Sequence, residues 1–230
     1  MEQLPLEVRL ADYAVFDSFL PGPNGVLLHA LQEAATVSSG AVLWLWGSPD
    51  TGRTHLLQAC VNTADASGYR TAYLPLGPEP EFPAAVLEGM DDLDVLCLDD
   101  LDAVVGQDAW ERQLFRLFER FRERGARLIL TAAQPPLQLR FGLADLASRF
   151  SSGAIFKVMP LSDDEKIAAL KLRANWRGID LPDETARFLM ARVDRRASQL
   201  FALLDRLDRQ ALVEKKKLTV PFVKSVLETL

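Results

Sequence analysis

Residues 41–66 predict a short buried strand, then a loop bounded by glycines, then a helix. Ala41–Trp46 (AVLWLW) is a continuous apolar run with glycine on both sides, which is typical of a buried strand. Arg53–Ala66 repeats apolar residues at helical spacing. The loop between them, Gly47–Thr54, matches the pattern G-x-x-x-x-G-K-[ST] at every defined position except one. A loop of this kind between a buried strand and a helix favours a nucleotide-binding P-loop fold.

The chain up to Pro160 continues to alternate strand and helix patterns. Further strands are predicted at Arg70–Leu76, Asp94–Leu98, Arg127–Thr131 and Ala154–Val158, and further helices at Glu81–Met90 and Asp108–Arg124. Such alternation is typical of a parallel sheet with helices on both faces, an α/β class. Parallel sheets of this kind bind ligands at the carboxyl ends of their strands.

Beyond Pro160 only helical patterns occur. Ser162 and Glu165 form a predicted capping box at the start of the first of these helices. The predicted helices are Ser162–Trp176, Pro182–Val193, Arg195–Glu214 and Val220–Leu230. We therefore expect an N-terminal tail at 1–11, an α/β nucleotide-binding domain at 12–160 and a small all-helical domain at 161–230.

The composition narrows the class of protein and its setting. A formal net charge of −6 argues against a dominant, sequence-independent grip on DNA. Lys215–Lys217 is the one basic run, and a solvated helix end explains it more simply. The sequence has no apolar run long enough for a bilayer and no signal-peptide pattern, so we expect no membrane partner. Cys60 and Cys97 suggest no disulfide framework, which favours the cytoplasm.

The glycine loop has the chemistry of a phosphate site. The candidate nucleotide-binding residues in it are Gly47, Ser48, Pro49, Asp50, Thr51, Gly52, Arg53 and Thr54. Its glycines let backbone N–H groups point at phosphate oxygens, and the following helix presents its N-terminal dipole to the same anion. Thr54 is the expected Mg²⁺ ligand. Arg53 keeps the charge of the usual lysine on a larger planar group, whereas Asp50 would repel phosphate. The alternative is a strand-to-helix turn that binds nothing.

An acidic pair follows a second buried strand. Asp99 and Asp100 directly follow the predicted strand Asp94–Leu98. The metal-holding carboxylates of P-loop NTPases have the same position after a strand. We expect Asp99 to orient Mg²⁺. A turn that uses two aspartates is the simpler alternative, and the loop upstream favours the metal site.

Several motifs together give the chain a resemblance to a known family. From about residue 12 to its end, it resembles the AAA+ module of the bacterial replication initiator DnaA. The resemblance rests on the phosphate loop, the acidic strand end, the strand ending at Thr131 with Pro135-Pro136 after it, Asp145–Arg149, the helical lid, and Phe16–Phe19 with Gly22–Asn24. It implies an AAA+ fold and an arginine finger at Arg149, acting in trans on the ATP of DnaA. A surface arginine at a helix end is the alternative for Arg149.

The N-terminus carries a second, shorter motif. Gln3, Leu4, Pro5 and Leu6 offer one polar and two apolar anchors on a segment that proline keeps extended. In an arbitrary protein this is more simply a tail with scattered leucines. In front of a DnaA-like module it resembles the peptide that docks on the DNA polymerase III sliding clamp (the beta subunit).

The departures from the family pattern bear on the nucleotide. Ala133 stands where DnaA has an aspartate, and Ser198 stands where it has its second sensor arginine. With Asp50, these changes disfavour hydrolysis of ATP by the chain itself, so we expect the pocket to bind ADP. ATP and an empty pocket stay open as alternatives. We expect Mg²⁺ only when a nucleotide is bound. Leu20 and Pro21 are the expected walls for the base.

The resemblance implies a regulator that docks on the DNA-loaded clamp, promotes hydrolysis of the ATP bound to DnaA and so inactivates DnaA, preventing re-initiation of replication, with little ATPase activity of its own. DnaA continues into a helix-turn-helix domain beyond the lid, whereas this chain stops at Leu230, so we expect no direct sequence-specific DNA binding. An autonomous AAA+ ATPase, such as a replicative helicase loader, and an interaction module with a vestigial pocket are the alternatives. Homo-oligomerisation stays open.

Overall fold

The computed structural model describes residues 14–37, 40–77 and 82–228. The chain forms two compact units. The first holds Asn24–Met159 together with the residues just before Asp17, and the second holds Asp17–Pro23 together with the chain from Pro160 onward. The predicted tail at 1–11, with Gln3, Leu4, Pro5 and Leu6, lies outside the described residues.

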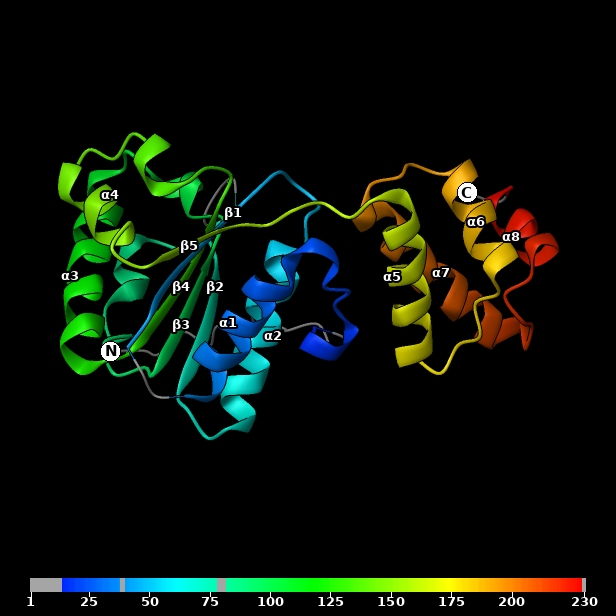
Figure 1. The fold of residues 1–230 in the computed structure, drawn as a ribbon, viewed down its shortest axis with the longest axis horizontal. Coiled ribbons are helices and arrows are strands. Elements are labelled where there is room, and N and C mark those ends of the chain that lie inside the picture. The colour runs from blue at the N-terminus through cyan, green and yellow to red at the C-terminus, as the bar shows by residue number, and fades with distance from the viewer. Residues whose placement is uncertain (1–13, 38–39, 78–81, 229–230) are drawn as a thin grey trace. The chain divides into compact units, whose positions relative to one another are not determined.

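A five-stranded parallel sheet forms the centre of the first unit (Figure 1). Its strand order is β2-β3-β4-β1-β5. The strands are β1 (Val42–Trp46), β2 (Thr71–Pro75), β3 (Val95–Asp99), β4 (Arg127–Ala132) and β5 (Ala154–Lys157). The five predicted strands are thus confirmed, with ends that differ by one residue or stay the same. Every residue of β3 and β4 is buried, as expected for inner strands covered on both faces.

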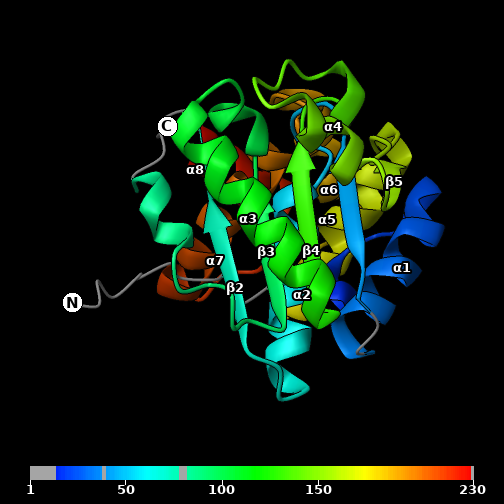
Figure 2. The same cartoon turned by 90° about the vertical axis from the view of Figure 1, so that its left-hand side faces the viewer.

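Helices cover both faces of this sheet (Figures 1 and 2). The pair α1 (Gly25–Thr36) and α2 (Arg53–Ala66) packs on one face, and α3 (Asp108–Arg124) packs on the other with α4 (Ala144–Phe150). Our predictions of α2 and α3 are confirmed. Helices α1 and α4 were not predicted. The short 3-10 turns are η1 (Phe16–Ser18), η2 (Gly22–Asn24), η3 (Ala84–Leu87), η4 (Leu101–Val104) and η5 (Pro136–Gln138).

The helix predicted for residues 81–90 is wrong. Within its described part, residues 82–90, only a single 3-10 turn forms, at Ala84–Leu87. Pro83 stands before it in an extended conformation and restricts the residue that precedes it, which prevents an earlier helix start. Gly89 has a φ of 90°, which ends any right-handed continuation.

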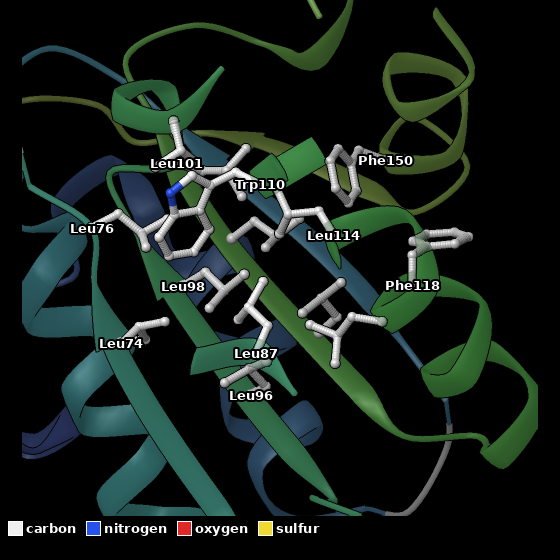
Figure 3. Packing of buried hydrophobic residues seen from close by; sticks show 14 of the residues in the cluster. Leu74, Leu76, Leu87, Leu96, Leu98, Leu101, Trp110, Leu114, Phe118 and Phe150 are labelled. Carbon is white, nitrogen blue, oxygen red and sulfur yellow. The ribbon is translucent and has the colours of Figure 1, made fainter. Parts of the chain in front are cut away.

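The core of the first unit lies between α3 and the sheet. Figure 3 shows Trp110, Leu114 and Phe118 of α3 beside leucines of β2 and β3. Phe150 of α4 is fully buried and is surrounded by aromatic rings. Its ring centroid lies 5.5 Å from that of Trp44 and 5.9 Å from that of Phe118. These contacts, typical of aromatic packing, hold the short helix α4 against α3 and β1.

One buried carboxylate connects α3 to two loops. Glu111 is 1% exposed. Its Oε1 accepts hydrogen bonds from the backbone N–H of Gly106 (2.7 Å) and Gly142 (3.0 Å), and its Oε2 accepts one from Leu143 (2.6 Å). Leu143 is the N-cap residue of α4. The carboxylate therefore fixes the point at which the chain enters α4.

The second unit is a helical bundle. It contains α5 (Asp163–Trp176), α6 (Asp183–Arg192), α7 (Ala197–Glu214) and α8 (Val220–Leu227), which confirms the four predicted helices. The capping box is present: Ser162 Oγ accepts from Glu165 N–H, and Glu165 Oε2 accepts from Ser162 N–H at 2.7 Å. None of the helices in the described part of the chain has the length and apolar character needed to cross a membrane.

We predict that Glu111→Ala destabilises the first unit by about 3 kcal/mol or more, because three part-buried backbone N–H groups lose a charged acceptor. The matched change Glu123→Ala, at an exposed position of the same helix, is expected to cost less than about 0.5 kcal/mol. Urea unfolding followed by tryptophan fluorescence measures both, since Trp44, Trp46 and Trp110 lie in this unit. Equal losses for the two variants would contradict the role of Glu111.

Candidate functional site

The strand order brings the two predicted site segments close together. β4 pairs with β1 on one side and with β3 on the other. The loop Gly47–Thr54 leaves the carboxyl end of β1, and Asp99 ends β3. Thr131, near the end of β4, lies between them. The site therefore occupies the edge at which open parallel sheets bind ligands.

Backbone geometry explains three residues of the loop. Gly52 has a φ of 91° and begins α2, a conformation that glycine adopts without strain. A Cβ at Gly47 would meet the carbonyl oxygen of Val158 at 2.7 Å, so only glycine fits there. Asp50 has a φ of 64°, which aspartate tolerates better than most residues, and it is exposed. Asp50 thus has a conformational reason to occupy the turn, whatever its charge does to a phosphate.

Arg53 lies at the start of α2, with its side chain only 12% exposed. Its Nη2 forms an ion pair with Asp100 Oδ1 at 3.0 Å. Its Nη1 is buried and has no hydrogen-bond partner among the described residues. No described side chain caps the N-terminus of α2 either. Uncapped helix amides next to an unpartnered guanidinium nitrogen fit an anion such as a phosphate.

A chain of hydrogen bonds joins β2, β3 and β4 at their carboxyl ends. Asp99, only 3% exposed, accepts from Tyr73 Oη at its Oδ2 (2.8 Å) and from Thr131 Oγ1 at its Oδ1 (2.5 Å). Asp100 N–H donates to Thr131 Oγ1 at 2.8 Å. Because that hydroxyl already accepts from the backbone, its own proton points at Asp99. The network thus holds Asp99 as an acceptor from both sides.

Two pKa values in this network are shifted. Burial raises the pKa of Tyr73 well above its usual range, and the neighbouring Asp99 charge raises it further, so the phenol stays a donor. Burial and the Asp99 charge also raise the pKa of Asp100, while Arg53 opposes that shift. A negatively charged cluster is therefore balanced in part by Arg53.

The fit to a directly bound Mg²⁺ is incomplete. Thr54 is exposed and offers its hydroxyl. Both oxygens of Asp99 already accept hydrogen bonds, so a metal would compete with Tyr73 and Thr131 or be reached through water. Within the described ranges, no three or more His, Cys, Asp or Glu residues group into a metal site.

Arg149 lies in the last turn of α4, with its side chain 28% exposed. Its Nε is 3.1 Å from Glu119 Oε1 of α3, and its Nη2 is 4.0 Å from Asp145 Oδ2. Its guanidinium carbon lies 4.5 Å from the centroid of the Phe115 ring. Since Phe150 is anchored in the core, the next residue back, Arg149, is held at the rim of the unit.

The other predicted residues do not join this cluster in the first unit. Leu20, Pro21 and Ser198 belong to the second unit, so their part in the site stays a prediction. Ala133, in place of the family's aspartate, contributes only its backbone N–H, which donates to Asp102 Oδ1 at 3.1 Å.

The sequence-based prediction missed two residues of the site region. Tyr73 was not singled out because its contact with Asp99 depends on the pairing of β2 with β3, which periodicity does not give. Glu119 was not singled out because a glutamate on an amphipathic helix is usually solvated. Its position two helical turns after Glu111, on the same face, was the available signal.

Comparisons with known proteins agree with this architecture. Domain III of the Thermotoga maritima replication initiation protein DnaA has 21% identity and a TM-score of 0.79, over 96% of this chain and 98% of that one. AMPPCP-bound DnaA from Aquifex aeolicus has 21% identity and a TM-score of 0.72, over 86% and 66%. The Thermotoga maritima RuvB Holliday junction branch migration motor has 19% identity and a TM-score of 0.65, over 89% and 67%.

At these identities the solved structures show the fold alone. Two family models match parts of the chain and indicate the family. The model of the bacterial DnaA ATPase domain matches residues 83–157. The model of the Hda lid domain matches residues 163–227. The chain is therefore a DnaA-like AAA+ protein in which a DnaA-type ATPase domain is followed by the lid domain of the Hda family.

Proposed function

We propose that this chain is a regulatory inactivator of DnaA. It docks on the DNA-loaded sliding clamp and promotes hydrolysis of DnaA-bound ATP, which prevents re-initiation of replication. The observation that carries the proposal is the Hda lid domain directly after a DnaA-type ATPase domain. The partly exposed Arg149 at the end of α4 supplies the chemical group that such a function needs.

The chemistry of Arg149 suits transfer of a phosphoryl group on a partner. A guanidinium spreads positive charge over the equatorial oxygens of the transition state, and its planar fork can donate two hydrogen bonds at once. An arginine finger supplied in trans raises the rate by about 10³–10⁵. In this proposal the chain contributes Arg149, while DnaA holds the nucleotide and its Mg²⁺.

The chain's own P-loop serves as a nucleotide site with a preference for ADP. AAA+ membership supports nucleotide binding. Arg53 Nη1 and the uncapped N-terminus of α2 are the groups that would hold the phosphates. With a nucleotide present, Thr54 would ligate Mg²⁺, with Asp99 acting on it through water. Compared with the DnaA pattern, the sequence lacks an aspartate at Ala133 and an arginine at Ser198, which favours binding over turnover.

An autonomous AAA+ ATPase is the second candidate. The assembled set Arg53, Asp99 and Thr131 at the strand ends favours it. ATP turnover by the purified chain, measured without DnaA, decides between the two candidates. Robust turnover supports the autonomous ATPase, and negligible turnover supports the regulator.

We predict that Arg149→Ala reduces stimulation of DnaA ATP hydrolysis by about 10³ or to the unstimulated rate, because the transition state loses its cation. The assay contains DnaA, clamp-loaded DNA and this chain. Arg140→Ala, at an exposed arginine just before α4, is the matched control and should stimulate like the wild type. Equal stimulation by Arg149→Ala and the wild type would remove the finger assignment.

We predict that Arg53→Ala weakens ADP binding about ten- to a hundred-fold, the effect of losing a charge-assisted hydrogen bond of ~1.5–3 kcal/mol. Isothermal titration calorimetry of the full chain measures this. Arg112→Ala, on the exposed side of α3, controls for loss of charge. If the wild type binds no ADP, or if both variants bind as the wild type does, the nucleotide role of Arg53 is wrong.

We predict that Gln3→Ala combined with Leu4→Ala weakens binding to the sliding clamp by about ten-fold or more, as for anchors at the centre of an interface. Surface plasmon resonance on immobilised clamp measures the affinity. Glu7→Ala, just after the motif, controls for a general effect of tail mutations. Unchanged affinity of the double variant would mean that the clamp is recruited by another surface or not at all.

A further inference from the structure

We propose that Glu119 is a positioning residue for Arg149: it fixes the inner edge of the guanidinium so that the outer edge faces the transferring phosphate. The inference rests on the proposed function of Arg149. It adds a residue on a different helix that acts only through Arg149 and touches no nucleotide itself.

One face of α3 supports the whole of the α4 segment. Glu111, Phe115 and Glu119 are four residues apart, so they follow one another along that face. Glu111 binds the chain where it enters α4, at Gly142 and Leu143. Phe115 and Glu119 contact Arg149 where α4 ends. The helix therefore holds both ends of the segment that carries Arg149.

The contact between Glu119 and Arg149 is a partly buried ion pair. Glu119 Oε1 and Arg149 Nε are 3.1 Å apart, and both atoms are buried. They are not aligned as a hydrogen bond, so the interaction is mainly electrostatic. The other oxygen of Glu119 accepts a hydrogen bond from Arg122 at 2.5 Å. Glu119 thus has a second partner on its own helix.

The arrangement leaves one edge of the guanidinium available. Nε faces Glu119, and the guanidinium carbon lies over the Phe115 ring, 4.5 Å from its centroid. Although Nε is buried, the side chain is 28% exposed, so its exposure lies in other atoms. Asp145 is the second nearby carboxylate, at 4.0 Å from Nη2, and it is 78% exposed, so solvent weakens its hold. The outer pair, Nη1 and Nη2, can still donate two parallel hydrogen bonds to a phosphoryl group.

Fixing a long side chain before the partner arrives should increase the rate of the chemical step. A free arginine must lose its rotamer freedom when it meets the transition state, whereas a positioned one has already lost it. Loss of the contact is expected to lower the maximal rate of DnaA ATP hydrolysis. The half-saturating concentration of this protein should stay unchanged. General loss of structure would change both.

The test compares Glu119→Ala, Glu119→Gln and Arg149→Ala in the full chain, with DnaA and clamp-loaded DNA. We expect Glu119→Ala to lower the maximal stimulated rate about ten-fold, with an unchanged half-saturating concentration. Glu119→Gln keeps the size but removes the charge that carries the contact, so it should retain less than half of the rate. Glu123→Ala, one turn further along α3, should retain all of it.

A second measurement needs no partner. The order parameter of the Arg149 Nε–H, from ¹⁵N relaxation, should fall in Glu119→Ala and stay near the wild-type value in Glu123→Ala. An unchanged order parameter overturns the proposal. A higher maximal rate for Glu119→Ala also overturns it, because the contact would then hold Arg149 back from the phosphoryl group. If Arg149→Ala is inactive while Glu119→Ala is fully active, the positioning role alone fails. If Arg149→Ala stimulates fully, the finger and this inference fail together.

Discussion

The first unit depends on one buried carboxylate, that of Glu111. Three backbone amides from two separate loops meet it, so a single side chain holds the loop before α3 and the start of α4. Burying a carboxylate is unfavourable unless its lone pairs are satisfied, and three N–H donors at 2.6–3.0 Å satisfy them. This contact and the buried ring of Phe150 together place Arg149, because the seven residues of α4 are too few to be stable as an isolated helix.

The strand ends form a second polar centre with a defined direction of hydrogen bonding. The backbone N–H of Asp100 orients Thr131, Thr131 donates to Asp99, and Tyr73 donates to Asp99 from the opposite side. Arg53 then offsets the charge of Asp100. In this hydrogen-bond network a neighbour determines whether each group donates or accepts, so the site is preorganised before any ligand binds.

Two arginines of the first unit thus have opposite surroundings. Arg53 is directed inward, paired with Asp100 and 12% exposed. Arg149 is at the rim, 28% exposed, and its partner Glu119 comes from a neighbouring helix. In the proposed function, Arg53 binds a phosphate of the chain's own nucleotide, and Arg149 acts on a phosphate held by another protein. A regulator that keeps its own nucleotide while acting on that of DnaA would need both.

The sequence by itself determined the class of fold and the position of the phosphate loop. Continuous apolar strands, helical periodicity and the glycines of Gly47–Thr54 are local signals, and they were sufficient for the five strands, for α2 and α3, and for the four helices of the second unit. Local signals failed for residues 81–90, where Pro83 and Gly89 leave a single 3-10 turn, and for α1 and α4. Only the tertiary structure decided the pairing of Tyr73 with Asp99 and of Glu119 with Arg149, because strand register and helix packing join residues about 26 and 30 positions apart in the sequence.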